Sequence, residues 1–134
     1  EMRHKLDNQY KTETRRRVYD TQLDCVWEAV NRVCDVPSHV IAIACREQQY
    51  VTARFFFFYL ARMRTACTWK NIGFYAGGRD HSTVMHGFQQ VVNWLSYDKS
   101  IQEQMKRIEE VLEARFDAGD ELFGPSKRLQ FGFI

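Results

Sequence analysis

The sequence has few residues that interrupt helices and no long apolar segment. Its 134 residues include 2 prolines and 7 glycines. No apolar run approaches the roughly 20 residues that a membrane helix needs, and residues 1–11 are charged and polar, which predicts no secretory signal. With 45% apolar and 27% charged residues, the composition is ordinary for a globular protein. We therefore expect one soluble, mainly helical domain that makes no membrane contact.

Signatures of metal binding and of catalysis are also missing. The cysteines Cys25, Cys34, Cys45 and Cys67 form no CxxC pair, and the histidines do not complete a zinc-binding spacing. The cysteines are therefore expected to be small buried thiols in a protein of a reducing compartment. The phosphate-loop pattern GxxxxGK[ST] does not occur, and no nucleophile–base or carboxylate pair has a credible spacing. We expect a protein that is not an enzyme and that uses no cofactor and no metal.

The charge that is present is distributed unevenly. The net charge is +2, but residues 46–79 carry six basic side chains against one acid, and residues 80–134 carry six against nine acids. The basic side chains of the first block are Arg46, Arg54, Arg62, Arg64, Lys70 and Arg79. Such a block fits binding to a polyanion, and it also fits a solvated face, so the charge alone leaves both open.

Hydrophobic periodicity predicts helices in the first half of the chain. One covers residues 21–34, with apolar positions 23, 26, 27, 30 and 33 on one face and a capping box at Thr21 and Asp24. Residues 35–38 end it, and a short second helix follows near residues 39–45. A third helix over 47–64 contains Phe55–Phe58, which point in every direction. A central helix packed on several sides is favoured over one with a phenylalanine on a contact surface.

The second half is predicted to hold a short helix, a glycine turn and two longer helices. Thr68 caps the short helix, Gly77 and Gly78 end it, and Asp80 caps the next helix, whose buried stripe is at positions 84, 88, 91, 92 and 95. A capping box at Ser100 and Glu103 starts the last helix, with a buried edge at positions 101, 105, 108, 111, 112 and 116. The pattern predicts an all-α, compact helical bundle that contains a helix-turn-helix and a long C-terminal helix. Its domain covers residues 21–116, between a basic polar lead-in (1–20) and a C-terminal tail (117–134).

Polar side chains gather in the first turn of the helix that starts after Asp80. His81 can donate to or accept from a base edge, the hydroxyls of Ser82 and Thr83 can do either, and a threonine methyl group can meet that of thymine. The N–H groups of a helix start favour a phosphate, which Arg79 is placed to support. A helix-turn-helix reads the major groove in this way. A first turn rich in Ser and Thr is also common at ordinary helix starts, so the pattern alone does not decide.

The stretch around the glycine turn is more specific. The octapeptide GGRDHSTV at Gly77–Val84, preceded by Ile72-Gly73, resembles the C-terminal DNA-binding domain of the bacterial chromosomal replication initiator DnaA, as do Ala53-Arg54 and Tyr59–Arg62 upstream. The similarity covers about residues 21–114. It implies a domain that binds a short asymmetric duplex site, similar to the DnaA box, as a monomer per site. It also implies a cytoplasmic, nucleoid-associated protein of a bacterial or phage-infected cell.

The resemblance further implies roles for single residues. The positions that read bases in the major groove or anchor the neighbouring phosphate are Asp80, His81, Ser82 and Thr83. Arg54 and Arg62 match positions that hold phosphates, and Arg46 matches a basic residue that enters the adjacent minor groove. Lys70 is either a further backbone contact or an ordinary solvent-exposed lysine.

Three residues depart from the family pattern, and they put affinity and the preferred site in question. Glu47 and Gln48 replace part of a more basic loop, and Phe55 stands where a polar residue is common. Two hypotheses result: sequence-specific binding of double-stranded DNA, with replication-initiation proteins as further partners, or a protein-interaction module that has lost this binding. The second rests on Phe55–Phe58, the acidic last helix and the apolar end of the tail. The chain is either a fragment of a longer initiator or a stand-alone relative that starts at Met2.

Overall fold

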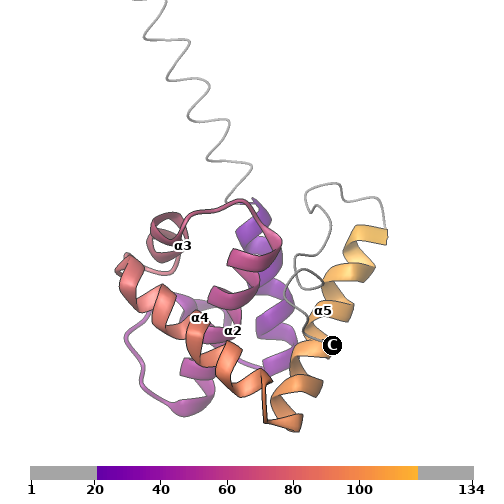
Figure 1. Cartoon of the computed structure of the whole chain (residues 1–134). Coiled ribbons are helices and arrows are strands. Elements are labelled where there is room, and N and C mark those ends of the chain that lie inside the picture. The colour runs from indigo at the N-terminus through magenta and orange to yellow at the C-terminus, as the bar shows by residue number, and fades with distance from the viewer. Residues whose placement is uncertain (1–20, 118–134) are drawn as a thin grey trace, which may run out of the picture.

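The computed structural model describes residues 21–117, and these are mostly helical (Figure 1). Residues 21–34 are helical, and the 3-10 helix η1 (Ser38–Ile41) follows; the remaining elements are α2 (Gln48–Arg64), α3 (Trp69–Tyr75), α4 (His81–Leu95) and α5 (Lys99–Asp117). No strand occurs in this range, so the all-α prediction is confirmed. The predicted lead-in and nearly all of the predicted tail lie outside the described residues.

Helix α2 is the centre of the core. Phe56, Phe57 and Phe58 are at most 1% exposed, because helices pack on several sides of α2. The Phe57 ring lies edge-on to Trp27 of the 21–34 helix, and Tyr59 stacks on Phe88 of α4. Burial of each large apolar side chain contributes about 1.5–3 kcal/mol. The interpretation of this segment as a central helix is confirmed.

The segment between the 21–34 helix and α2 differs from the prediction. The 21–34 helix ends as expected, with Asp35 at a φ of 55° and the Val36 amide bonded to the carbonyl of Asn31. The predicted helix over 39–45 is only partly confirmed, because the 3-10 helix η1 covers residues 38–41 and residues 42–47 are a loop. One contact that competes with an α-helix here is the hydrogen bond from the Arg54 guanidinium to the carbonyl of Val40, which in such a helix would accept from the amide four residues later.

The start of α5 also differs from the prediction. The cap is Asp98, whose Oδ1 accepts hydrogen bonds from the amides of Ser100 (3.0 Å) and Ile101 (3.3 Å). The Ser100 hydroxyl and these amides hold the pKa of Asp98 below its usual value. The predicted capping box at Ser100 and Glu103 is therefore wrong, since Ser100 already lies inside the helix.

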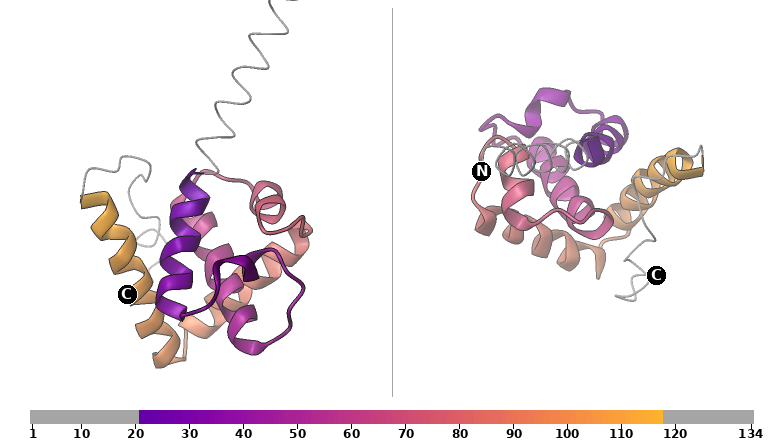
Figure 2. Two further views of the ribbon diagram at one scale, coloured as in Figure 1. Left: turned by 180° about the vertical axis from the view of Figure 1, so that it is seen from behind. Right: turned by 90° about the horizontal axis from the view of Figure 1, so that it is seen from above.

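Helix α5 covers one side of the core and lies away from α3 (Figures 1 and 2). Its buried edge contains Met105, Ile108 and Leu112, as predicted, while the side chain of residue 116 is not described. Two ion pairs tie it to the rest of the domain, Arg64–Glu113 at 2.8 Å and Arg115–Glu28 at 2.7 Å.

The cysteines of residues 21–117 are thiols, with no disulfide between them. Cys25 and Cys67 are buried as expected, and Cys34 and Cys45 are half-buried. Burial raises the pKa of Cys34 to about 11. Across the same range the side chains form no cluster suited to a metal ion. No helix in this part of the chain is both long and apolar enough to span a bilayer.

Candidate nucleic-acid interface

The turn between α3 and α4 depends on glycine. Gly77 and Gly78 have φ values of 86° and 79°, which L side chains rarely adopt. The Arg79 amide donates to the carbonyl of Gly73 at 2.8 Å. A Cβ on Gly73 would lie only 2.2 Å from the Arg79 oxygen, so this close approach requires glycine. The short helix before the turn starts at Thr68, whose Oγ1 accepts from the Asn71 amide at 3.1 Å, as predicted.

Packing against α2 fixes which face of α4 is exposed. Val84 and Val91 are buried, and Gly87 lies where a Cβ would be 2.7 Å from the rings of Phe55 and Phe58. The two helices can therefore approach closely at Gly87. The opposite face of α4 carries an exposed stripe of Ser82, Met85, His86 and Gln89.

The first turn of α4 is exposed and internally ordered. Asp80 is in the N-cap position, as predicted, but its side chain makes no capping hydrogen bond. Its carboxylate instead accepts from the Ser82 hydroxyl (2.7 Å) and lies 3.0 Å from His81 Nδ1. The Ser82 hydroxyl and the neighbouring His81 lower the pKa of Asp80. With Nδ1 turned to Asp80, Nε2 of His81 is the ring nitrogen left for a base edge or a phosphate.

The loop 42–47 lies beside this turn and carries Arg46, whose side chain is exposed. In Figure 1 the loop is the violet segment on the same side of the molecule as the start of α4. Arg79 joins the two, because its guanidinium donates to the carbonyl of Ile43 at 2.8 Å. The backbone of Ala42 also packs on Gly77, where a Cβ would lie 2.7 Å from the Ala42 oxygen. The structure thus brings Arg79 and the loop that carries Arg46 to the turn before α4.

The other basic candidates differ in exposure. Lys70 is exposed on α3. Arg62 is half-buried, donates to the Cys67 carbonyl at 2.9 Å and lies 4.8 Å above the ring of Trp69. Arg54 is only 7% exposed and binds backbone carbonyls inside the domain.

Two exposed residues of α4, His86 and Gln89, were not predicted as site residues from the sequence. They stand four and seven positions after Ser82, so the helical spacing that located the buried stripe could also have located this one. The Phe55 departure is explained by packing, since its ring stacks on Trp94 (5.9 Å) and meets His86 edge-on.

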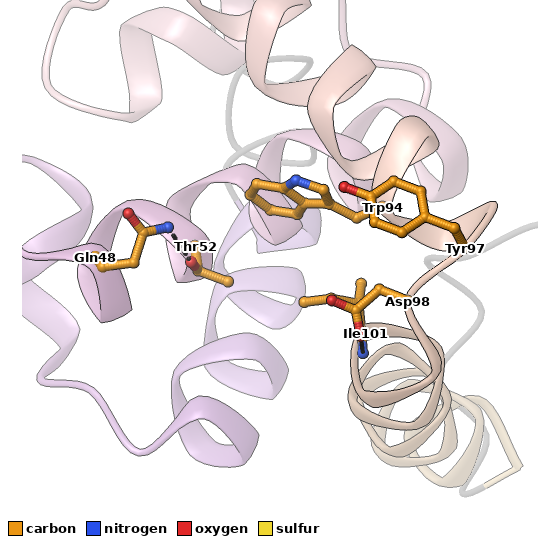
Figure 3. Close-up of a pocket in the computed structure, with 6 residues that line it drawn as sticks. All are labelled: Gln48, Thr52, Trp94, Tyr97, Asp98 and Ile101. Carbon is orange, nitrogen blue, oxygen red and sulfur yellow. Dashed lines mark hydrogen bonds between the residues drawn. The ribbon is translucent and has the colours of Figure 1, made fainter.

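A hollow of about 240 Å³ lies at the far end of α4 (Figure 3). Its lining residues come from the start of α2, the end of α4, the turn that follows and the start of α5, and they are Gln48, Thr52, Trp94, Tyr97, Asp98 and Ile101. None of the predicted site residues lines it. The exposed polar groups around the glycine turn therefore form the candidate interface.

The comparisons with known proteins agree with this geometry. Residues 23–91 match the family described as the bacterial DnaA protein helix-turn-helix. This range contains the core helix α2, the glycine turn and most of α4. The chain belongs to the bacterial DnaA helix-turn-helix family. Membership of this helix-turn-helix family supports DNA binding by the domain.

The most similar relatives include chromosomal replication initiator proteins DnaA. The protein from Porphyromonas gingivalis is 31% identical over 93 residues, which are 69% of this chain and 20% of the relative. The DnaA of Streptococcus mutans is 43% identical over 63 residues, or 47% of this chain and 14% of the relative. The chain thus spans about a fifth or less of the length of these DnaA proteins.

Proposed function

We propose that the domain binds double-stranded DNA in a sequence-specific manner, with the exposed face of α4 in the major groove. The observation that carries this proposal is the exposed first turn of α4, where Asp80, His81, Ser82 and Thr83 are all accessible to a base edge. Hydroxyl, imidazole and carboxylate groups can all bond to base edges in that groove. His86 and Gln89, one and two turns further along, extend the reading surface.

Basic groups around this face supply the contacts to the DNA backbone and the second groove. Arg46, which is exposed on the loop beside the turn before α4, enters the adjacent minor groove, where a guanidinium is attracted by the negative potential. Lys70, Arg62 and Arg79 lie near the phosphates on either side of the reading helix. Family membership supports a site similar to the DnaA box, a role in replication initiation or its regulation, and one monomer per site. Replication-initiation proteins are the further partners we propose.

A salt-titrated binding assay tests this proposal. The full chain is titrated onto a labelled duplex that carries a DnaA box and onto a scrambled duplex of equal length, and fluorescence anisotropy is measured. We expect tighter binding to the box and a steep fall with salt, because each phosphate contact contributes about 0.9 to the slope of log K against log salt. Absence of binding to both duplexes at low salt would overturn the proposal, and equal binding to both would overturn its sequence specificity.

The alternative, a protein-interaction module, has less support in the structure than in the sequence. Phe56, Phe57 and Phe58, which suggested a contact surface, are buried in the core. The exposed apolar side chains that remain include Phe74 and Tyr97, 76% and 70% exposed. Light scattering separates the two functions, because a DNA-binding monomer changes mass when the duplex is added and an interaction module self-associates or ignores the duplex.

A further inference from the structure

Arg54 is a buried arginine whose hydrogen bonds point at one loop. Its two terminal nitrogens donate to the carbonyls of Val40 at 3.2 Å and of Cys45 at 2.6 Å. The first acceptor lies just before the loop 42–47, and the second is the residue next to Arg46. With 7% of its surface exposed, the Arg54 side chain has little area left for a phosphate.

Arg79 holds the same loop from its other side. One of its nitrogens donates to the carbonyl of Ile43 at 2.8 Å, and the other to Ala76 in the glycine turn at 3.4 Å. The backbone of Ala42 lies directly on Gly77. The loop is therefore fixed between the core helix α2 and the turn before α4.

The two guanidinium groups are close enough to affect each other. Burial lowers the pKa of both, and the positive charge of Arg79 lowers that of Arg54 further. Two cations side by side at a half-buried site raise the electrostatic energy of the free domain. Each planar guanidinium can donate to two separate acceptors at once. The resulting hydrogen bonds to four backbone carbonyls offset this energy, and they also fix the loop.

We propose that Arg54 and Arg79 are positioning residues that hold the loop 42–47 so that Arg46 stands at a fixed distance from the first turn of α4. Two reading elements that bind neighbouring grooves must keep a constant separation, and a preordered loop avoids the loss of entropy on binding. The proposal rests on the proposed DNA binding. It differs from the role that the resemblance implies for Arg54, which is a direct phosphate contact.

A double-mutant cycle distinguishes the two roles. Arg54→Lys keeps the charge but cannot reach both carbonyls in the same way, and it is combined with Arg46→Ala. If Arg54 acts through Arg46, Arg54→Lys weakens binding to the preferred duplex about fivefold or more with Arg46 present and less than about twofold in the Arg46→Ala chain. Equal losses in both backgrounds would overturn the positioning role of Arg54.

Arg62→Lys is the matched control, because Arg62 is on the same helix and binds a carbonyl outside this loop. Its effect is expected to add to that of Arg46→Ala. Arg79→Lys is a second test variant from the opposite side of the loop, and it should show the same coupling as Arg54→Lys. Thermal unfolding of each variant identifies any that fails to fold, and the cycle is then completed with the other arginine.

NMR relaxation of the backbone amides in the free protein provides a readout that does not involve DNA. Arg54→Lys is expected to lower the order parameters of residues 43–47 while leaving those within α4 unchanged. Unchanged order parameters in the loop would overturn the inference even if DNA binding fell. If the unmodified chain bound neither duplex, the proposed function would fail, and the relaxation data would still decide whether Arg54 holds the loop.

Discussion

Three arginines near the recognition helix illustrate how residues of one type perform different tasks. Arg46 is exposed on a loop, Arg79 is half-buried and binds that loop, and Arg54 is buried behind it. All three belong to the basic block that predicts a polyanion partner. Their sequence positions do not separate a side chain that contacts DNA from one that supports the contacting loop, because that depends on which carbonyls lie within reach after folding.

His81→Ala tests whether a single side chain in the first turn of α4 contributes to base recognition. The exposed imidazole of His81 is oriented by Asp80, and its loss is expected to weaken binding to the preferred duplex by about 1–3 kcal/mol, with little change on scrambled DNA. Affinities for both duplexes measured by anisotropy check this. Gln102→Ala, an exposed change on α5, is the control. Equal losses on both duplexes would show that His81 contacts the DNA backbone instead of a base.

Helix ends determine how the elements of this domain are joined. The turn before α4 can form because glycines at positions 73, 77 and 78 allow either a close backbone contact or a positive φ. The start of α5 is stabilised by Asp98, which accepts hydrogen bonds from two of the first amides of the helix. The sequence located both junctions to within a few residues, but it assigned the second cap to Ser100, since either residue type is a common cap and only the backbone path selects one.

Gly77→Ala and Gly78→Ala form a matched pair at the glycine turn. Both place a side chain at positive φ, with a strain of about 1–2 kcal/mol. Only the Gly77 variant also puts a Cβ 2.7 Å from the Ala42 oxygen, which adds about 1–3 kcal/mol and displaces the loop of Arg46. Chemical denaturation of both variants measures the difference. Equal destabilisation would contradict the close contact between loop and turn.

Asp98 gives α5 a predictable dependence on pH. Its pKa is lower in the folded chain than the ordinary 3.8 because Ser100 and the Ile101 amide bond its carboxylate. The carboxylate therefore stabilises the fold at neutral pH, and this contribution is lost as the pH falls from the ordinary pKa through the lowered one. Between about pH 5 and about pH 2, the Tm of the chain should fall more steeply than that of Asp98→Asn, which keeps a capping oxygen. Parallel curves would contradict the capping role.

The balance of charge differs between two sides of the described domain. The exposed Arg46 and Lys70 lie on the loop 42–47 and on α3, whereas α5 lies on the other side (Figures 1 and 2) and carries exposed acids and exposed bases in similar number. A net charge of +2 conceals this difference. The arrangement favours approach to DNA with the α3 and α4 side first, because the acids of α5 offset the attraction of its bases to phosphates.

Lys70→Gln tests this orientation through the salt dependence of binding. Loss of one phosphate contact is expected to weaken binding to the preferred and the scrambled duplex alike, and to reduce the salt slope by about 0.9. Lys106→Gln on α5 makes the same change of charge on the opposite side of the molecule, and its slope should remain that of the unchanged chain. If both variants changed the slope equally, the proposed orientation would be wrong.

The sequence by itself determined most of the helices, the glycine turn and the resemblance to the family. Apolar residues at helical spacing, glycine at positive φ and the GGRDHSTV octapeptide are local signals, which act over a few residues and need no knowledge of distant contacts. These signals placed α2, α3 and α4 and located the exposed turn at Asp80–Thr83. They also predicted that Phe55–Phe58 belong to a central helix, because no single helix face can bury four consecutive side chains.

Only the tertiary structure decided how the residues outside these signals are used. It replaced the second part of the predicted helix over 39–45 by a loop, and it showed that Arg54 binds carbonyls 9 and 14 positions before it in the chain. It also showed that Arg79 reaches back 36 positions to Ile43. Hydrogen bonds over such separations depend on how the helices pack and leave no periodic trace in the sequence. For this reason the turn at Asp80–Thr83 could be predicted, and the hydrogen bonds that hold the loop 42–47 could not.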